Sequence, residues 1–550
     1  MITVGQYLLA CHLVDAHGAA ERFEAFCYPS KQGRRNLSPR TFLIGSLLSI
    51  QAKGSMRYND VHTLLTSEIP PFAMVELGVA KEVRREDGTR VACVCLTMDG
   101  LYNFTRKVRK SCGAQGRAID PATKDVLLDI VNRIIRATLP TRPDGSSAYA
   151  ADETGVWAWN KGRKVPTEVK DRPEYLEDDV TTDELERSQD RRSVDPDGAW
   201  GRKTKKRGGT ETFFGYSMHG MVRAPAMGCG YESEPLLLEY VDLTPASTDL
   251  VRATLGMIDQ MRAAGSKVTE LIVDRHYSFK SHERWSVELR KRDVRQVLDL
   301  RSEDCNGFLD AGGTRVAAGV PHCPLIPEHL GHLTRPGPVE KRPKSLCGPN
   351  GEDPDADERK AKLELFRQQI DLRSKYALER HGPGNGNPLD SRWGCPAAAG
   401  KIGCPLRPGT VEAATALGLP VVEGAGDLTP PPKVCTQATV TLKYEDVQPK
   451  LQQEHYWGSE KWEVSYGRRS RVEGFFGTLK DASVGNLRRD AFRGDCLGLR
   501  LLHVGLSSAI TNVRLLRKWH LSTGNRLDLP DVLLANFDPP TEYLLEDPAA

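Results

Sequence analysis

A stretch late in the chain carries side chains whose types suit work on a phosphate and whose spacing suits one helix. On a helical projection, an acid, two cations and a phenol fall within about 60° of one another. These residues are Tyr466, Arg469, Glu473 and Lys480. An apolar stripe beside them consists of Val472, Phe475, Phe476 and Leu479. We predict a single helix over residues 461–482 that packs this stripe against a sheet and turns its polar face into a site.

The charged pair on this helix also has an ordinary interpretation, since Arg and Glu one turn apart are usually a solvated ion pair worth ~0.3–0.5 kcal/mol. The full pattern, Tyr466-x2-Arg469-x3-Glu473-x6-Lys480, is more specific because it fixes four residue types at three gaps. It resembles the Tyr-Arg-Glu-Lys signature of bacterial insertion-sequence transposases with a DDE active site. The resemblance implies an RNase H-like catalytic domain and two further aspartates upstream, each on a strand or at its end.

Two upstream segments offer these aspartates. Residues 146–159 combine small, aromatic and β-branched residues between turn signals, which predicts a strand that contains Asp152. An acid in a largely apolar strand is costly unless it binds a metal or a partner. Glu153 would point to the opposite face of the strand, so Asp152 is the better candidate. Residues 268–273 predict a later strand, which ends at Asp274.

The order of the expected elements fits the implied fold. Strands are expected at residues 146–159, 211–222, 235–243 and 268–273, with a helix at 248–264 and a fifth strand at 295–300. Three strands, a helix and a strand are the opening of an RNase H-like fold. We therefore predict an α/β protein with an RNase H-like mixed sheet, flanking helices, a helical N-terminal domain and a large insertion before the last catalytic helix.

The expected domains follow from these elements. They are a helical N-terminal DNA-binding domain at 1–140, an RNase H-like catalytic domain in two parts at 141–300 and 451–525, a Cys-containing insertion at 301–450 and an acidic tail at 526–550. A long exposed loop is expected at 160–208, and its basic run at 202–207 would either grip phosphate or stay solvated. A second basic run at 106–110 leaves the same two interpretations open. The resemblance favours contact with DNA.

The expected insertion holds six cysteines, and four of them suit a tetrahedral zinc site. These four are Cys323, Cys395, Cys404 and Cys435. Their gaps are not the compact Cys-x2-Cys type, so free buried thiols are the more common alternative. The sequence thus predicts either a structural Zn²⁺ site or a set of buried thiols in this region.

The composition excludes few classes of protein. Lys and Arg total 76 against 73 acidic residues, a net charge of +3, which by itself does not indicate nucleic-acid binding. No apolar run approaches the ~20 residues of a membrane span, and the N-terminal residues show no secretory signal. The odd number of cysteines, 13, suits a reducing cytosol better than a disulfide framework. We expect a cytoplasmic protein at the bacterial nucleoid, with no membrane partner.

The resemblance also implies the chemistry of the site. Asp152 would bridge two Mg²⁺ or Mn²⁺ ions, with Asp274 on one ion and Glu473 on the other. Tyr466, Arg469 and Lys480 would bind DNA. The expected partners are double-stranded DNA, as terminal inverted repeats and as target, and a second copy of the chain in a homodimeric synaptic complex.

Three positions depart from the family's usual residues, namely Ser217, His276 and Phe476. They keep two alternatives open. One is a domesticated or inactive DNA-binding derivative, and the other is an RNase H-like nuclease without strand transfer.

Overall fold

The computed structural model describes residues 1–30, 37–112, 118–141, 145–162, 195–204, 210–248, 250–336, 356–384, 386–387, 389–524 and 532–533. The chain forms two compact units. Unit 1 comprises Met1–Val268 and Arg469–Ala550, and unit 2 comprises Thr269–Arg468. Both units contain helices and strands, and the strand pairs are antiparallel in some places and parallel in others. The α/β class expected from the sequence is therefore confirmed.

The N-terminal part of unit 1 is mainly helical, as predicted. Its helices are α1 (Val4–Asp15), α2 (Ala19–Cys27), α3 (Pro39–Lys53), α4 (Tyr58–Thr63), α5 (Pro71–Glu76), α6 (Met98–Ser111) and α7 (Pro121–Arg136). A hairpin of β1 (Ala80–Arg84) and β2 (Arg90–Val94) interrupts them. Local sequence explains their limits. In α3, for example, the Ser38 side chain accepts the Thr41 N–H, Pro39 opens the first turn, and Gly54 ends the helix with a left-handed backbone.

An antiparallel sheet follows in unit 1. The long strand β5 (Thr210–Arg223) pairs along one edge with β3 (Ala148–Trp157). Along its other edge, the first half pairs with β4 (Ala199–Thr204) and the second half with β6 (Leu238–Pro245). The predicted loop at 160–208 is wrong in part, because residues 199–204 form β4 and pair with β5. The composition of a charged segment does not show whether a partner strand lies beside it. Residues 163–194 and 205–208 of that loop, which include Lys205, Lys206 and Arg207 of the basic run, lie outside the described residues.

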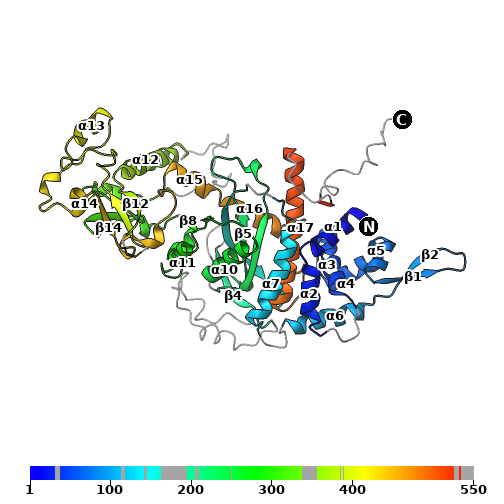
Figure 1. The fold of residues 1–550 in the computed structure, drawn as a ribbon. Helices are drawn as coiled ribbons and strands as arrows, with labels where there is room; N and C mark the ends of the chain where they lie inside the picture. The colour runs from blue at the N-terminus through cyan, green and yellow to red at the C-terminus, as the bar shows by residue number, and fades with distance from the viewer. Residues whose placement is uncertain are drawn as a thin grey trace, which may run out of the picture. The chain divides into compact units, whose positions relative to one another are not determined.

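One hydrophobic core joins the N-terminal helices of unit 1 to this sheet and to α17 (Leu497–Thr523). Helices α7 and α17 pack side by side (Figure 1). Each helix also contacts β6 through an Asn side-chain amide, which forms backbone hydrogen bonds of the kind that a neighbouring strand would form. Asn132 exchanges two 2.9 Å hydrogen bonds with the backbone of Val241, and Asn512 binds the N–H and carbonyl of Leu238 at 2.9 and 2.8 Å. The helices and the sheet of unit 1 therefore form a single packed body.

Unit 2 is built from short elements. Two of its strands, β7 (Glu270–Ile272) and β8 (Arg295–Val297), pair in parallel. One three-stranded sheet contains β9 (Leu309–Ala311), β10 (Thr314–Ala317) and β11 (Val320–His322). A second three-stranded sheet contains β12 (Glu379–Pro383), β13 (Ser391–Gly394) and β14 (Thr439–Leu442). Its helices include α11 (Ser286–Lys291), α12 (Ala356–Lys375), α13 (Thr410–Ala416), α14 (Lys433–Thr436) and α15 (Glu460–Gly467). Two small hydrophobic clusters lie around the two three-stranded sheets. Helix α10 (Leu250–Ala263), which lies between β6 and β7 in the chain, belongs to unit 1.

Candidate active site

The predicted catalytic helix is two helices in the structure. α15 ends at Gly467, and α16 (Ser470–Lys480) begins after Arg469, so the single helix expected over residues 461–482 is wrong. Of the four residues predicted to share one face, only Glu473 and Lys480 lie within α16. Arg469 directly precedes it, and Tyr466 belongs to α15 in unit 2.

Helix α16 packs on the sheet of unit 1 through the predicted apolar stripe. Val472, Phe475, Phe476 and Leu479 are all buried. α16 packs against the sheet at Gly220 of β5, which is the cross-strand partner of Asp152 in β3. A Cβ atom at Gly220 would lie 3.0 Å from the Phe476 ring and 2.8 Å from Leu238, so the glycine permits this close packing. The same face of the sheet therefore carries both Asp152 and α16.

A buried arginine anchors the first turn of α16. The guanidinium of Arg471 donates to the backbone carbonyls of Arg223, Glu234 and Pro235, at 3.2, 2.9 and 2.6 Å. These carbonyls lie at the end of β5 and in the segment before β6, so the bonds fix the helix against the sheet. Sequence reasoning missed Arg471, since it stands in a run of arginines and nothing local distinguishes it from its neighbours.

Arg469 joins two of the predicted catalytic acids. Its Nη1 donates to Asp152 Oδ2 at 3.1 Å, and its Nη2 pairs with Glu473 Oε1. The Asp152 and Arg469 side chains are about one fifth exposed, at 20% and 19%, whereas Glu473 is 53% exposed. The structure therefore brings Asp152 and Glu473 to one guanidinium although they lie far apart in sequence. The pair is not an isolated surface ion pair of the helix, because the strand acid is part of it.

The other end of α16 contacts the same strand. Lys480 Nζ hydrogen-bonds to Thr154 Oγ1. Thr154 lies two residues after Asp152 and therefore on the same face of β3. Glu153, between them, faces the opposite side, where its carboxylate lies 3.8 Å from the buried ring of His219. Asp152, and not Glu153, thus lies on the side of the sheet that α16 covers, and the choice of Asp152 as the catalytic acid stays a prediction.

Asp274 and Tyr466 belong to unit 2 and are described there. Asp274 follows β7 by two residues, close to the predicted strand end, and its side chain accepts the His276 N–H at 2.8 Å, which starts a short 3-10 helix (Arg275–Phe279). Tyr466 stacks on Trp462, with ring centroids 4.9 Å apart and planes at 8°. Arg468, which sequence reasoning also missed, is buried and pairs with Glu270 of β7. The gathering of Asp274 with the two acids of unit 1 stays a prediction.

The carboxylates of unit 1 suit a divalent cation in part. Magnesium is commonly held by one or two carboxylates, with water and substrate phosphate as the other ligands. Asp152 and Glu473 supply two such groups on one face. In the described part of the chain, no three His, Cys, Asp or Glu side chains are already grouped closely enough to hold an ion. The residues of unit 1 therefore fit a shared, substrate-completed ion site and not a closed protein cage.

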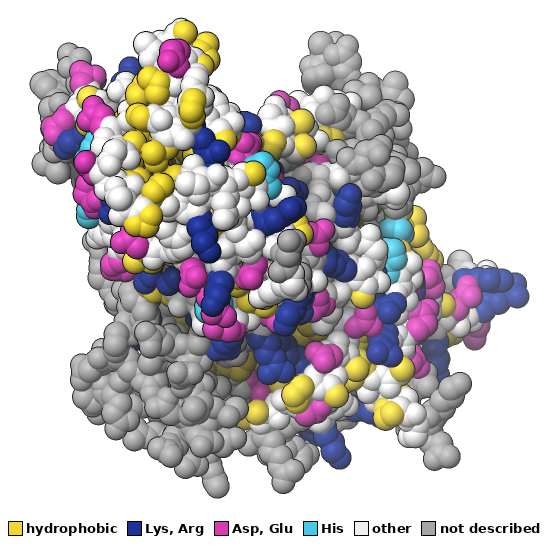
Figure 2. Space-filling view, turned by 60° about the vertical axis from the view of Figure 1, so that its left-hand side comes forward, with side chains coloured by type: hydrophobic (Ala, Val, Ile, Leu, Met, Phe, Trp, Pro, Cys, Tyr) yellow, Lys and Arg dark blue, Asp and Glu magenta, His cyan; other side chains and the backbone are white. Residues whose placement is uncertain are grey.

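The basic run on α6 is partly engaged within unit 1. Lys107 lies 3.7 Å from the centre of the Tyr28 ring, and Arg109 pairs with Asp495. On the face shown in Figure 2, Lys and Arg side chains are interspersed with Asp and Glu, as the near-balanced composition predicts. These contacts show a structural use for two of the cations; contact of α6 with DNA remains a prediction.

The four cysteines predicted as zinc ligands line one cavity of unit 2. Burial, together with the neighbouring cysteine thiolates, raises the pKa of the Cys323 thiol to about 12 and that of Cys435 to about 11. Cys305 is buried elsewhere in the unit, and Cys347 lies outside the described residues. Among the described cysteines of the predicted insertion, those that line the cavity are thus the four that the sequence suggested.

Comparison with known proteins adds no further constraint. No protein-family model matches the chain, and no curated protein sequence is significantly similar to it. None of the helices in the described ranges combines the length and the apolar composition needed to cross a lipid bilayer.

Proposed function

We propose that this chain is a DNA transposase of the DDE type, with an RNase H-like catalytic domain. It would cleave DNA at the ends of an insertion sequence and transfer the freed strands into target DNA. One observation carries the proposal: the guanidinium of Arg469 contacts both Glu473, which belongs to the Tyr-Arg-Glu-Lys pattern, and Asp152, the strand acid that the resemblance required upstream. A chance pattern on an unrelated helix would have no reason to meet that strand acid.

The proposed reaction assigns a task to Arg469 and to the three predicted acids. Asp152 and Glu473 would hold Mg²⁺ or Mn²⁺ together with the substrate phosphate, and Asp274 would be the third carboxylate that the resemblance implies. Two bound ions supply activation of the attacking oxygen, stabilisation of the leaving oxygen and neutralisation of charge on the phosphate. Arg469 keeps the two carboxylates together in the free protein. Its planar fork then turns to the phosphate beside the cut, for which it has the right geometry.

The remaining residues would position DNA. Lys480, held by Thr154 in the free protein, is placed to contact the backbone as a point charge. Tyr466 and the exposed basic residues of α6 would bind the terminal inverted repeats. Two ends must be joined to one target, so we infer a homodimer in the synaptic complex, acting at the nucleoid in the cytoplasm.

The test uses three matched variants of the full chain. We expect Asp152→Asn and Glu473→Gln to bind DNA carrying the element's own terminal repeats and to lose strand cleavage in magnesium. Glu153→Gln is the control, since it changes an acid on the same strand that faces away from α16. It should keep cleavage. Equal cleavage by Glu473→Gln and the parent protein would refute the assignment.

The product of the parent protein decides between the alternatives. With terminal repeats, magnesium and a target plasmid, a joined product supports a transposase. Nicks without joining indicate an RNase H-like nuclease, and binding alone indicates a domesticated or inactive derivative.

A further inference from the structure

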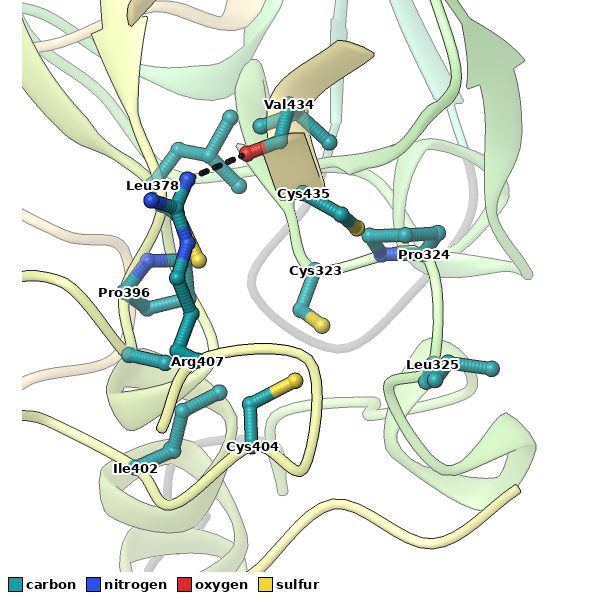
Figure 3. Close-up of a pocket in the computed structure, with 12 residues that line it drawn as sticks. Cys323, Pro324, Leu325, Leu378, Pro396, Ile402, Cys404, Arg407, Val434 and Cys435 are labelled. Atoms are coloured by element: carbon teal, nitrogen blue, oxygen red, sulfur yellow. Dashed lines mark hydrogen bonds between the residues drawn. The ribbon is translucent and has the colours of Figure 1, made fainter. Parts of the chain in front are cut away.

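Four cysteines from separate segments of unit 2 surround one small cavity. Cys323, Cys395, Cys404 and Cys435 are each at most 7% exposed. All four line a cavity of about 10 Å³, and Figure 3 shows Cys323, Cys404 and Cys435 around the same space. A volume of this size is close to that of one water molecule. The cavity is therefore too small for an organic ligand and matches a single ion.

Two of the cysteines lie in separate turns that have the same sequence and the same backbone hydrogen bond. The tripeptide Cys-Pro-Leu occurs at 323–325 and again at 404–406. In each copy, the residue three positions after the cysteine donates its N–H to the cysteine carbonyl, at 3.1 and 2.9 Å. Both cysteines are thus held by the same local backbone hydrogen bond.

The cavity lies between the two small hydrophobic clusters of unit 2. Cys435, on the short helix α14, belongs to one cluster, and the other three cysteines belong to the second. Clusters of this size bury little apolar area, and small cores are commonly reinforced by a metal or by disulfides. One metal ion bound by Cys435 and by the other three sulfurs would join the clusters.

We propose that Cys323, Cys395, Cys404 and Cys435 bind one Zn²⁺ that holds the two clusters of unit 2 together. Four thiolates fill a tetrahedral shell and leave no open position, so the site is structural and not catalytic. Soft sulfur ligands select zinc and reject magnesium, which keeps this site separate from the carboxylates of unit 1.

A cation beside the cavity suits this ligand set. Four thiolates and one Zn²⁺ carry a net charge of about −2. Arg407 lines the cavity, and one arm of its guanidinium donates to the Gln437 carbonyl at 2.7 Å. Its Nε is buried and has no hydrogen-bond partner among the described residues. That N–H is available to a metal-bound sulfur, an outer contact of the kind that tunes metal sites.

Binding requires the sulfurs to turn inward. Zinc–sulfur bonds of ~2.3 Å place the four sulfurs ~3.8 Å apart. The described residues hold no three potential ligands already grouped in this way. Rotation of the cysteine side chains about their Cα–Cβ bonds would bring the sulfurs towards the cavity that they line.

The experiment measures metal directly on the full chain, purified under reducing conditions without added metal. We expect about one zinc per chain by elemental mass spectrometry, released when a mercurial reagent titrates the thiols. Exchange with cobalt should give the intense thiolate-to-cobalt absorption of a four-sulfur site. Cys404→Ser should weaken zinc binding at least ~tenfold. Cys305→Ser is the matched control, because Cys305 is equally buried in unit 2 and does not line the cavity.

The outcomes separate cleanly and do not involve DNA, so they are independent of the proposed transposase activity. A parent protein that holds no zinc and gives no cobalt–thiolate band overturns the proposal. So does a zinc affinity of Cys404→Ser equal to that of the parent protein, or a disulfide between any two of the four cysteines in place of metal. If Cys404→Ser does not fold, the thiol titration of the parent still decides, because it needs no variant.

Discussion

The ion pair between Asp152 and Arg469 makes a measurable prediction about the candidate active site. At 3.1 Å, Coulomb's law gives an attraction of about 5 kcal/mol at an effective dielectric constant of 20 and about 1 kcal/mol in bulk water. Both side chains are about one fifth exposed, so desolvation cancels part of the gain. We expect a coupling free energy of about 1–2 kcal/mol from a double-mutant cycle of Asp152→Asn and Arg469→Gln.

The ion pair of Glu473 with the same guanidinium should have a smaller coupling free energy than that of Asp152. Glu473 is 53% exposed and lies one turn from Arg469, so a cycle of Glu473→Gln with Arg469→Gln should give about 0.3–0.5 kcal/mol. A matched external control is the pair of Asp15 and Arg40, also in unit 1, with side chains 39% and 31% exposed. Its coupling should stay below about 1 kcal/mol.

Hydrogen exchange of the amides in β3 and α16 is the suitable assay, because it reports the stability of these segments without requiring both units to unfold together. Raising the salt concentration from 0.1 to 1 M shortens the screening length from ~10 to ~3 Å and should lower the coupling. A coupling of Asp152 with Arg469 within about 0.3 kcal/mol of zero would mean that the two side chains act independently. The geometry on which the site is built would then be wrong.

Two further predictions concern the support of the site and its surroundings. Gly220→Ala places a Cβ 2.8 Å from Leu238 and 3.0 Å from Phe476, and should destabilise unit 1 by about 1–2 kcal/mol and lower cleavage activity, whereas Gly256→Ala, in an open position on α10, should be neutral or stabilising in the same urea titration. Equal effects of the two changes would contradict the close packing of α16 on the sheet. Burial raises the pKa of Asp195 to about 6 from an ordinary value of 3.8, so the folded protein binds this proton more tightly than the unfolded chain does. Protonation of Asp195 therefore adds to the free energy of unfolding, fully below about pH 4, and this contribution is lost as the pH rises through about 6. Asp195→Asn should therefore cost more stability at pH 4.5 than at pH 7, by about 2 kcal/mol, and a constant difference across this range would show that Asp195 is not buried as described.

The sequence by itself determined the local elements. The strand that carries Asp152, the stripe of α16 and the ends of α3 all follow from side-chain period and capping residues, which act over a few positions. The choice of Asp152 over Glu153 also followed from the alternation of a strand. The four cysteines could be selected by residue type, although their gaps left the outcome open.

The tertiary structure decided what depends on residues far apart in the chain. It paired β4 with β5, ended α15 at Gly467, and let α16 approach the sheet over Gly220. It also brought Arg469 to Asp152 and placed the four cysteines around one cavity. Patterns within a segment show which face of that segment is apolar, but not which distant segment will cover it. Partner choice is fixed only when the whole chain packs, because the free energy of each contact depends on the shape and charge of both sides.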